Sequence, residues 1–259
     1  MARIALVTGS SGGIGRAIAL RLAREGIQVA VASRTDDRYP GTNDETVAII
    51  RESGGTAEAF EVDLSVPSDR LGLVARVSER LGDVDILVNN AAVSTFEPIA
   101  VFRERRFDLM IDVQVKAPLQ LTQQVLPAMR RKGRGWIINV SSPAAFHPRV
   151  DETAVEQGSA GTVYGMCKAA LERLTTGTAV EVYADGIDVV ALAPTAIVPT
   201  FGAAAFFTVD RFEQEPPEAM AEAVAVLVRE DAPRRTGQIL YSQSVLAEAG
   251  IPLPAMGAV

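Results

Sequence analysis

Short apolar runs alternate along the chain with longer segments in which apolar residues recur at helical spacing. Several of the short runs are apolar at consecutive positions, which is typical of strands buried on both faces of a parallel sheet. The predicted strands are 3–8, 28–33, 57–62, 85–90, 136–141, 188–193 and 238–242. Helical patterns separate many of them, at 14–26, 67–82, 107–133, 162–186 and 216–230. This alternation predicts one α/β domain over residues 1–259, with a Rossmann-like, doubly wound parallel sheet.

Two stretches lack either pattern, residues 144–161 and 199–216. Loops of this length in a compact domain usually serve function. Residues 189–209 carry no charge and are long enough to span a bilayer. Pro194 and Pro199 interrupt this stretch, so we interpret it as a strand followed by an apolar loop and expect no membrane span.

Composition narrows the classes of function. A net charge of −7 argues against nucleic acid or an anionic membrane surface as a partner. One cysteine and one histidine allow no internal disulfide and predict no metal site. The opening residues 1–9 run straight into glycines instead of a cleavage site, so we expect a cytoplasmic protein without a signal peptide.

A glycine-rich stretch, "TGSSGGIG" at 8–15, follows the first predicted strand and opens a helix. Glycines permit a tight turn and let backbone N–H groups approach a phosphate, and the helix N-terminus favours negative charge there. The alternative is a turn that only joins a strand to a helix. Its place at the first βα turn favours a dinucleotide.

Tyr164 and Lys168, in "YGMCK", are four residues apart and therefore share one face of a predicted helix. On its own this pair is ordinary, because Tyr and Lys often fall at helical spacing by chance. Three further motifs change that interpretation. "TGSSGGIG", "NNAA" at 89–92, "NVSS" at 139–142 and "YGMCK" together resemble, in order and at similar spacing, the motifs of the short-chain dehydrogenase/reductase family.

The resemblance spans residues 3–242 and implies a nicotinamide-dependent oxidoreductase. Asp63 matches the family residue that meets the adenine, and Asn90 matches one beside the ribose and nicotinamide; either could instead cap a turn. The full set of cofactor contacts that the resemblance implies is Gly9, Ser11, Gly13, Ile14, Gly15, Ser33, Arg34, Asp63, Leu64, Asn90, Ala91, Tyr164, Lys168, Pro194 and Ile197.

The end of the second strand bears on the choice between NAD(H) and NADP(H). Ser33 stands where an NAD-type member would carry Asp, and Arg34 follows it. A serine can hydrogen-bond the 2′-phosphate of NADP and an arginine can bind it through a charge-assisted fork, so we expect NADP(H). In the alternative, Arg34 is a solvated residue and Asp36 or Asp37 binds the ribose of NAD.

For catalysis, the resemblance implies Tyr164 as the acid/base, with Lys168 lowering its pKa and holding the ribose. Ser142 would hydrogen-bond the substrate oxygen, with Ser141 as the second candidate. Gln114 stands where the family commonly has an Asn that supports a water chain from the lysine. Its longer side chain could keep this relay or displace the water.

Three other features depart from the family or stay open. The stretch between Ser142 and Tyr164 is longer than usual, and its His147 could touch substrate or be solvated. Thr195 replaces the usual glycine after Pro194, which leaves Ile197 and Thr200 as candidates beside the nicotinamide. Cys167 is expected to pack as a small apolar residue.

We therefore expect interconversion of a ketone and a secondary alcohol on a fairly apolar substrate, steroid-like, terpenoid-like or 3-oxoacyl. The apolar residues Phe201, Phe206 and Phe207 could line that substrate, or fill core or a subunit contact. The resemblance also implies a homo-oligomer, a tetramer or dimer. The alternatives are an NADP(H)-binding sensor or scaffold without turnover and, within enzymes, a dehydratase or epimerase of the related extended group; the short tail after the last strand argues against the latter.

Overall fold

The structure is a computed structural model that describes residues 2–36, 40–148, 161–204 and 212–257. Seven parallel strands form one sheet in the order β3-β2-β1-β4-β5-β6-β7. Their bounds are β1 (Ile4–Thr8), β2 (Gln28–Ser33), β3 (Ala57–Glu61), β4 (Ile86–Asn89), β5 (Gly135–Val140), β6 (Ile187–Ala193) and β7 (Ile239–Tyr241). The strand order reverses between β1 and β4, so the predicted doubly wound sheet is confirmed.

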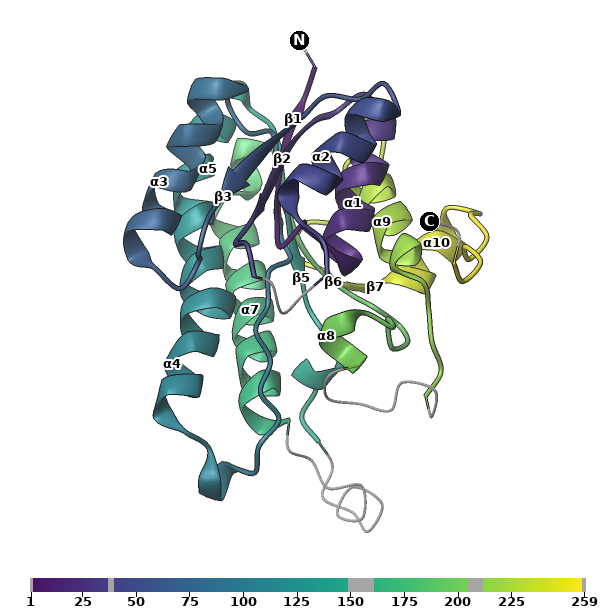
Figure 1. Ribbon diagram of the computed structural model, residues 1–259. Helices are drawn as coiled ribbons and strands as arrows, with labels where there is room; N and C mark the ends of the chain where they lie inside the picture. The colour runs from purple at the N-terminus through teal and green to yellow at the C-terminus, as the bar shows by residue number, and fades with distance from the viewer. Residues whose placement is uncertain (1, 37–39, 149–160, 205–211, 258–259) are drawn as a thin grey trace.

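Helices cover both faces of the sheet (Figure 1). One layer holds α1 (Gly13–Arg24), α2 (Asn43–Glu52), α9 (Pro217–Leu227) and α10 (Ser242–Glu248), and the other holds α3 (Pro67–Arg80), α4 (Glu104–Ile111), α5 (Ala117–Lys132) and α7 (Thr162–Glu181). Short helices are η1 (Ile99–Val101), η3 (Pro143–Ala145), η4 (Tyr183–Asp185) and α8 (Phe201–Ala204). Figure 1 shows α8 beyond the carboxyl ends of the strands.

Two apolar clusters, one on each face of the sheet, make up most of the core. Residues such as Ile18 and Val224 pack α1 and α9 on one face, and Leu73, Leu121 and Met129 pack α3 and α5 on the other. The central strands contribute side chains to both clusters, which is why their sequences are apolar at consecutive positions.

The predicted helix 107–133 is longer in the structure and contains a distortion. α4 passes without a break into a π-helical turn, η2 (Asp112–Lys116), and then into α5. π-turns inside helices often occur at functional sites. This one places Gln114 in the buried part of the helix.

The uncharged stretch 189–209 begins as the buried strand β6 and continues through a loop to α8. Its last residues, 205–209, lie outside the described part of the chain. In the ranges that the structure describes, no helix is long and apolar enough to cross a membrane. The interpretation of this stretch as a strand followed by a loop therefore holds as far as Thr200, after which the short helix α8 begins.

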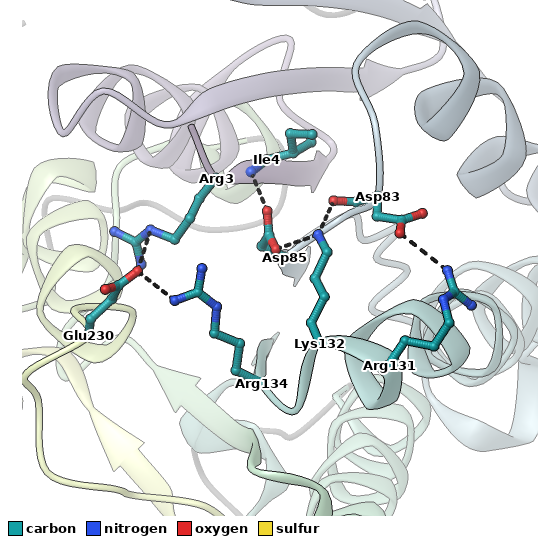
Figure 2. A network of polar contacts seen from close by, with 8 residues as sticks. All are labelled: Arg3, Ile4, Asp83, Asp85, Arg131, Lys132, Arg134 and Glu230. Carbon is teal, nitrogen blue, oxygen red and sulfur yellow. Dashed lines mark hydrogen bonds and ion pairs between the residues drawn. The ribbon is translucent and has the colours of Figure 1, made fainter. Parts of the chain in front are cut away.

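A network of charged side chains ties the amino ends of β1 and β4 to their neighbours (Figure 2). The buried Asp85 carboxylate accepts hydrogen bonds from the Ile4 backbone N–H at 2.9 Å and from Lys132 Nζ at 2.7 Å. On the exposed side, Glu230 pairs with Arg134 at 3.0 Å and lies 4.0 Å from Arg3. The network anchors the edge of the sheet opposite the glycine loop.

Candidate active site

The site begins where β1 and β4 diverge, at the carboxyl edge of the sheet. Thr8 Oγ1, at the end of β1, accepts the backbone N–H groups of Asn90 and Ala91 at 3.0 and 3.1 Å. The Asn90 amide donates in return to the carbonyl oxygens of Thr8 and Gly9 at 2.8 and 3.1 Å. Asn90 therefore fixes the glycine loop against the end of β4.

The glycine loop needs its glycines at specific positions. Gly9 and Gly13 have φ angles of +66° and +52°, in the left-handed region that glycine tolerates. A Cβ on Gly15 would lie 2.2 Å from the Gly9 carbonyl oxygen, so the helix could not pack this closely on the loop with any side chain there. Ser11 and Ile14, between them, are partly exposed.

This loop fits a pyrophosphate. The N-terminus of α1 has no acidic residue in its first turn and no side-chain cap on its N–H groups. Backbone N–H groups at such a helix end bind phosphate oxygens. The loop and the first turn of α1 would therefore hold the diphosphate of a nicotinamide dinucleotide.

At the end of β2 the structure departs from the simplest expectation for the ribose. The Ser33 hydroxyl already donates to Asn43 Oδ1 at 2.6 Å. Arg34 forms an ion pair with Asp36 at 2.9 Å, and its other guanidinium nitrogen lies 3.9 Å from Asp63. Of these two predicted residues, Ser33 therefore has its hydroxyl occupied by Asn43, and the Arg34 guanidinium is paired with carboxylates.

Asp63 both caps a turn and lines a cleft. Its Oδ1 accepts the Ser65 backbone N–H at 2.9 Å and the Ser65 hydroxyl at 2.6 Å, while Oδ2 faces Arg34. Leu64 is buried beside it. Arg34, Asp63 and Val93 line a cleft of about 800 Å³ that continues to Arg105 and Arg106 on α4.

The residues predicted to transfer the proton come from the end of β5 and from α7. Ser141 and Ser142 follow β5, and the two hydroxyls separate: Ser141 Oγ donates to Glu172 Oε1 at 2.6 Å, whereas Ser142 hydrogen-bonds Tyr164. Tyr164 and Lys168 lie one turn apart on α7, with Lys168 Nζ 5.6 Å from the centre of the Tyr164 ring. The geometry brings Ser142, Tyr164 and Lys168 together and turns Ser141 toward Glu172.

Burial dominates the protonation of this pair. It raises the pKa of Tyr164 above its usual value, against the hydrogen bond with Ser142. It lowers the pKa of Lys168 to about 8, against the opposing electrostatic effects of Cys167 and Glu172. The Lys168 ammonium donates to the Val140 carbonyl at 2.8 Å and lies over the face of the Tyr164 ring.

Gln114 is almost fully buried in the π-turn, which packs against α7. Its Nε2 donates to the Val93 carbonyl at 2.9 Å. Its Oε1 is buried and has no hydrogen-bond partner in the described part of the protein. A buried acceptor without a partner is costly unless a water or ligand satisfies it.

The segment after β6 is held by a buried carboxylate. Glu215 Oε1 accepts the backbone N–H of Thr195 at 3.2 Å and the Ser242 hydroxyl at 2.7 Å. Ile197 pairs its N–H with the Glu213 carbonyl and its C=O with the Glu215 N–H, both at 3.0 Å. The Ile197 N–H is therefore used within the chain, and Pro194 lies partly exposed before this clamp.

Aromatic rings stand at the mouth of the site. The Phe96 ring lies 5.4 Å from that of Tyr164, and Phe146 stacks on Tyr241 at 6.1 Å. His147 is exposed, and Phe201 is half exposed on α8. Phe206 and Phe207 lie outside the described residues. Thr200 contacts the glycine loop at Gly13, as a Cβ there would lie 3.1 Å from its methyl group.

The cysteine and the possible metal ligands were also considered in the sequence. Cys167 is fully buried against Met110 and Val163, and burial raises the pKa of its thiol, so it packs as an apolar residue. Among the described residues, no three His, Cys, Asp or Glu side chains gather as a metal site would require.

The sequence patterns missed three contributors to the site. Thr8 was part of the glycine motif but was not assigned a contact, and its signal is its place directly at the end of β1. Phe96 and Glu172 carry no motif of their own. Only helical spacing, four residues after Lys168, could have indicated Glu172.

The sequence of this chain is similar to those of known proteins. The family model described as short chain dehydrogenase matches residues 3–207. Dehydrogenase/reductase SDR family member 4 of Homo sapiens is 35% identical over 248 residues, which cover 91% of this chain and 84% of the human protein.

Solved structures of related proteins have the same fold as this chain. A putative dehydrogenase from Xanthomonas campestris is 33% identical, with a TM-score of 0.84, over 96% of this chain and 90% of its own. A metagenomic short-chain oxidoreductase in complex with NADP is 30% identical, with a TM-score of 0.76, over 92% of this chain and 96% of its own.

Proposed function

Because this chain belongs to the short-chain dehydrogenase/reductase family of oxidoreductases, we propose that it interconverts a ketone and a secondary alcohol with NADP(H). One observation carries the proposal. The Ser142 hydroxyl and the Tyr164 phenol are hydrogen-bonded at the carboxyl edge of the sheet, with the Lys168 ammonium over the phenol ring.

Each of these residues has a part in moving the proton. A bound nicotinamide supplies or accepts the hydride at the carbonyl carbon. Tyr164 gives its proton to the carbonyl oxygen in reduction and takes it back in oxidation, and Ser142 donates a hydrogen bond to that oxygen. Lys168 stabilises the phenolate that Tyr164 becomes. The raised pKa of Tyr164 keeps the phenol protonated at neutral pH, which suits reduction.

Gln114 supports a proton path in this proposal. Its unpartnered Oε1 suits a water molecule between the π-turn and α7. We expect Gln114→Asn to keep part of the activity, because asparagine still has an amide oxygen that can accept a hydrogen bond from the water. Gln114→Leu should lose more activity, because leucine has no acceptor.

The preference for NADP(H) depends on Arg34. A guanidinium at the end of β2 binds a 2′-phosphate, and a relative of this chain was solved with NADP. The ion pair with Asp36 favours the second candidate, NAD(H), with Asp36 on the ribose hydroxyls.

The substrate is proposed to be fairly apolar, steroid-like, terpenoid-like or 3-oxoacyl, because the Phe96 ring stands beside the proton donor Tyr164. The exposed apolar side chains Phe107, Leu119 and Met166 on α4, α5 and α7 support a homo-oligomer, a dimer or tetramer. We propose a cytoplasmic location.

The test is NADPH oxidation with a panel of apolar ketones, acyl thioesters and quinones. Tyr164→Phe should lower turnover by about a hundredfold or more while leaving NADPH affinity nearly unchanged, because only the proton donor is lost. Tyr183→Phe is the matched control, since Tyr183 is exposed under Arg234 and away from the site. An active Tyr164→Phe enzyme contradicts the assignment. NADPH binding without turnover on any compound favours the sensor or scaffold.

A further inference from the structure

Glu172 is a charged residue that the proposed proton transfer leaves without a role. It lies on α7 one turn beyond Lys168, on the same face of the helix. Its Oε1 accepts the Ser141 hydroxyl at 2.6 Å, and Ser141 is only 3% exposed. The serine next to Ser142 therefore holds this carboxylate at the end of β5.

No cation in contact with Glu172, among the described residues, neutralises the negative charge that can act on Lys168. From β7, Tyr241 faces the carboxylate, whose charge contributes to the raised pKa of Tyr241. The Phe146 ring stacks on Tyr241 on the solvent side. Within the described chain, Glu172 forms no ion pair at contact distance with any arginine or lysine.

Lys168 needs such a charge. It is 2% exposed, and within the described ranges its ammonium donates one hydrogen bond, to the Val140 carbonyl on β5. Burying an ammonium without an opposite charge favours its neutral form. The titratable groups that face Lys168 are Tyr164, Cys167 and Glu172, all on α7. The first two are neutral at neutral pH, because burial raises the pKa of both.

We propose that Glu172 is a positioning residue of this site: its carboxylate, fixed by Ser141, keeps Lys168 in the ammonium form that the Tyr164 phenolate requires. The inference rests on the proposed function for its purpose, but the coupling of Glu172 to Lys168 is a property of the protein that can be measured without turnover.

The chain has three lysines, Lys116, Lys132 and Lys168. Lysine labelled with ¹³C at Cε therefore gives three NMR signals in the full protein, and Lys168→Arg identifies the one of interest. The pH titration of that signal is compared among the wild type, Glu172→Gln, Ser141→Ala and Glu181→Gln. Glutamine keeps an acceptor for the Ser141 hydroxyl but removes the charge.

We expect the Lys168 titration to move to lower pH by about half a unit or more in Glu172→Gln, because a nearby negative charge favours the ammonium. Ser141→Ala keeps the charge but loses the hydrogen bond that holds it, so it should move the titration in the same direction but by less than Glu172→Gln does. Glu181→Gln removes an exposed charge from the same helix and should move it by less than about 0.2 unit. An unmoved titration in Glu172→Gln, or an equal shift in Ser141→Ala, overturns the proposal. If Glu172→Gln does not fold, Glu172→Asp should give a smaller shift in the same direction, and no shift overturns the proposal.

Turnover provides the second readout. In Glu172→Gln the alkaline limb of the pH profile of kcat/KM should move to lower pH by the same amount as the Lys168 signal. A lower kcat/KM with an unmoved limb means a purely structural role and overturns the proposal. If the wild type turns over no ketone, the proposed function fails, while the Lys168 titration still tests Glu172.

Discussion

At the scale of single residues, charged side chains of the site are held by neighbours of opposite charge. Arg34 is the clearest case on the cofactor side, because it is shared between Asp36 and Asp63. Whatever binds there must displace or tolerate a carboxylate. Under the proposed function, cofactor preference would be set by a balance between the Arg34 guanidinium and the two carboxylates.

We predict that Arg34→Ala weakens NADPH about tenfold or more and NADH much less, because only NADPH offers a 2′-phosphate to the guanidinium. Asp36→Asn should strengthen NADPH by removing its competitor. Dissociation constants for both cofactors, from fluorescence titration, check the two changes. Equal losses for NADPH and NADH in Arg34→Ala would refute the phosphate contact, and loss of NADH binding in Asp36→Asn would favour the ribose role of Asp36.

Lys168 predicts a pH dependence of stability. In the unfolded chain its pKa is 10.5, and in the folded protein it is about 8. Between these values the unfolded state binds more protons, so rising pH stabilises the folded state. Lys168→Met should therefore stabilise the protein more at pH 7 than at pH 10, by about 3 kcal/mol at most, because 1 pKa unit corresponds to about 1.4 kcal/mol.

Denaturant unfolding of both proteins at the two pH values measures this difference. Lys116→Met serves as the control, since Lys116 is exposed and should show no such difference. If the stabilisation by Lys168→Met did not depend on pH, folding would not lower the pKa of Lys168.

At the scale of elements, the glycine loop shows why one residue type is required. We predict that Gly15→Ala lowers both cofactor affinity and the free energy of unfolding, because its Cβ would lie 2.2 Å from the Gly9 carbonyl and 2.5 Å from the Asn90 amide. Thermal unfolding and NADPH titration measure the two effects.

Gly72→Ala is the matched change in an ordinary helix. A Cβ on Gly72, inside α3, meets nothing within 4 Å, and alanine favours helix. This variant should be more stable by about 0.5–1 kcal/mol. If Gly15→Ala behaved like Gly72→Ala, the close approach of loop and helix would not matter.

The elements also show how far the sequence could predict this protein. Apolar runs located all seven strands to within a residue or two. The inner strands leave a strong signal because they are almost wholly buried, whereas the edge strands β3 and β7 are partly exposed. The helix α2 was missed, although Thr42 and Glu45 form the capping box that marks its start. The π-turn at Asp112–Lys116 could not be predicted, since its residues fit an ordinary helix.

Within the site, motifs predicted which residues would be near one another but not what holds them. They named Ser142, Tyr164 and Lys168 and left Ser141 as a second candidate for the same role. Separating the two serines required the direction of each side chain at the end of β5, which depends on Glu172 and Tyr164 in the folded helix. The occupied Ser33 hydroxyl likewise depends on Asn43, ten residues further along.

At the scale of the whole molecule, the two edges of the sheet have separate tasks. The carboxyl edge carries the glycine loop and the proton-transfer residues. The amino edge carries the charged network of Figure 2, in which Asp85 is buried between a backbone N–H and Lys132.

We predict that Lys132→Met lowers the free energy of unfolding by about 1–3 kcal/mol, because it leaves the buried Asp85 carboxylate without its cation. Arg131→Met, which breaks an exposed pair with Asp83, should cost less than about 0.5 kcal/mol. Urea unfolding measures both, and catalytic constants at low temperature should stay unchanged. A large loss of activity in folded Lys132→Met would contradict the separation of the two edges.

This separation has a practical consequence for anyone who wants to change the substrate. Mutant libraries can concentrate on η3, α8 and the residues directly after β4, which lie at the carboxyl edge of the sheet. The charged network at the far edge supplies stability that these libraries leave untouched, and strengthening it first would let more of their destabilising members still fold.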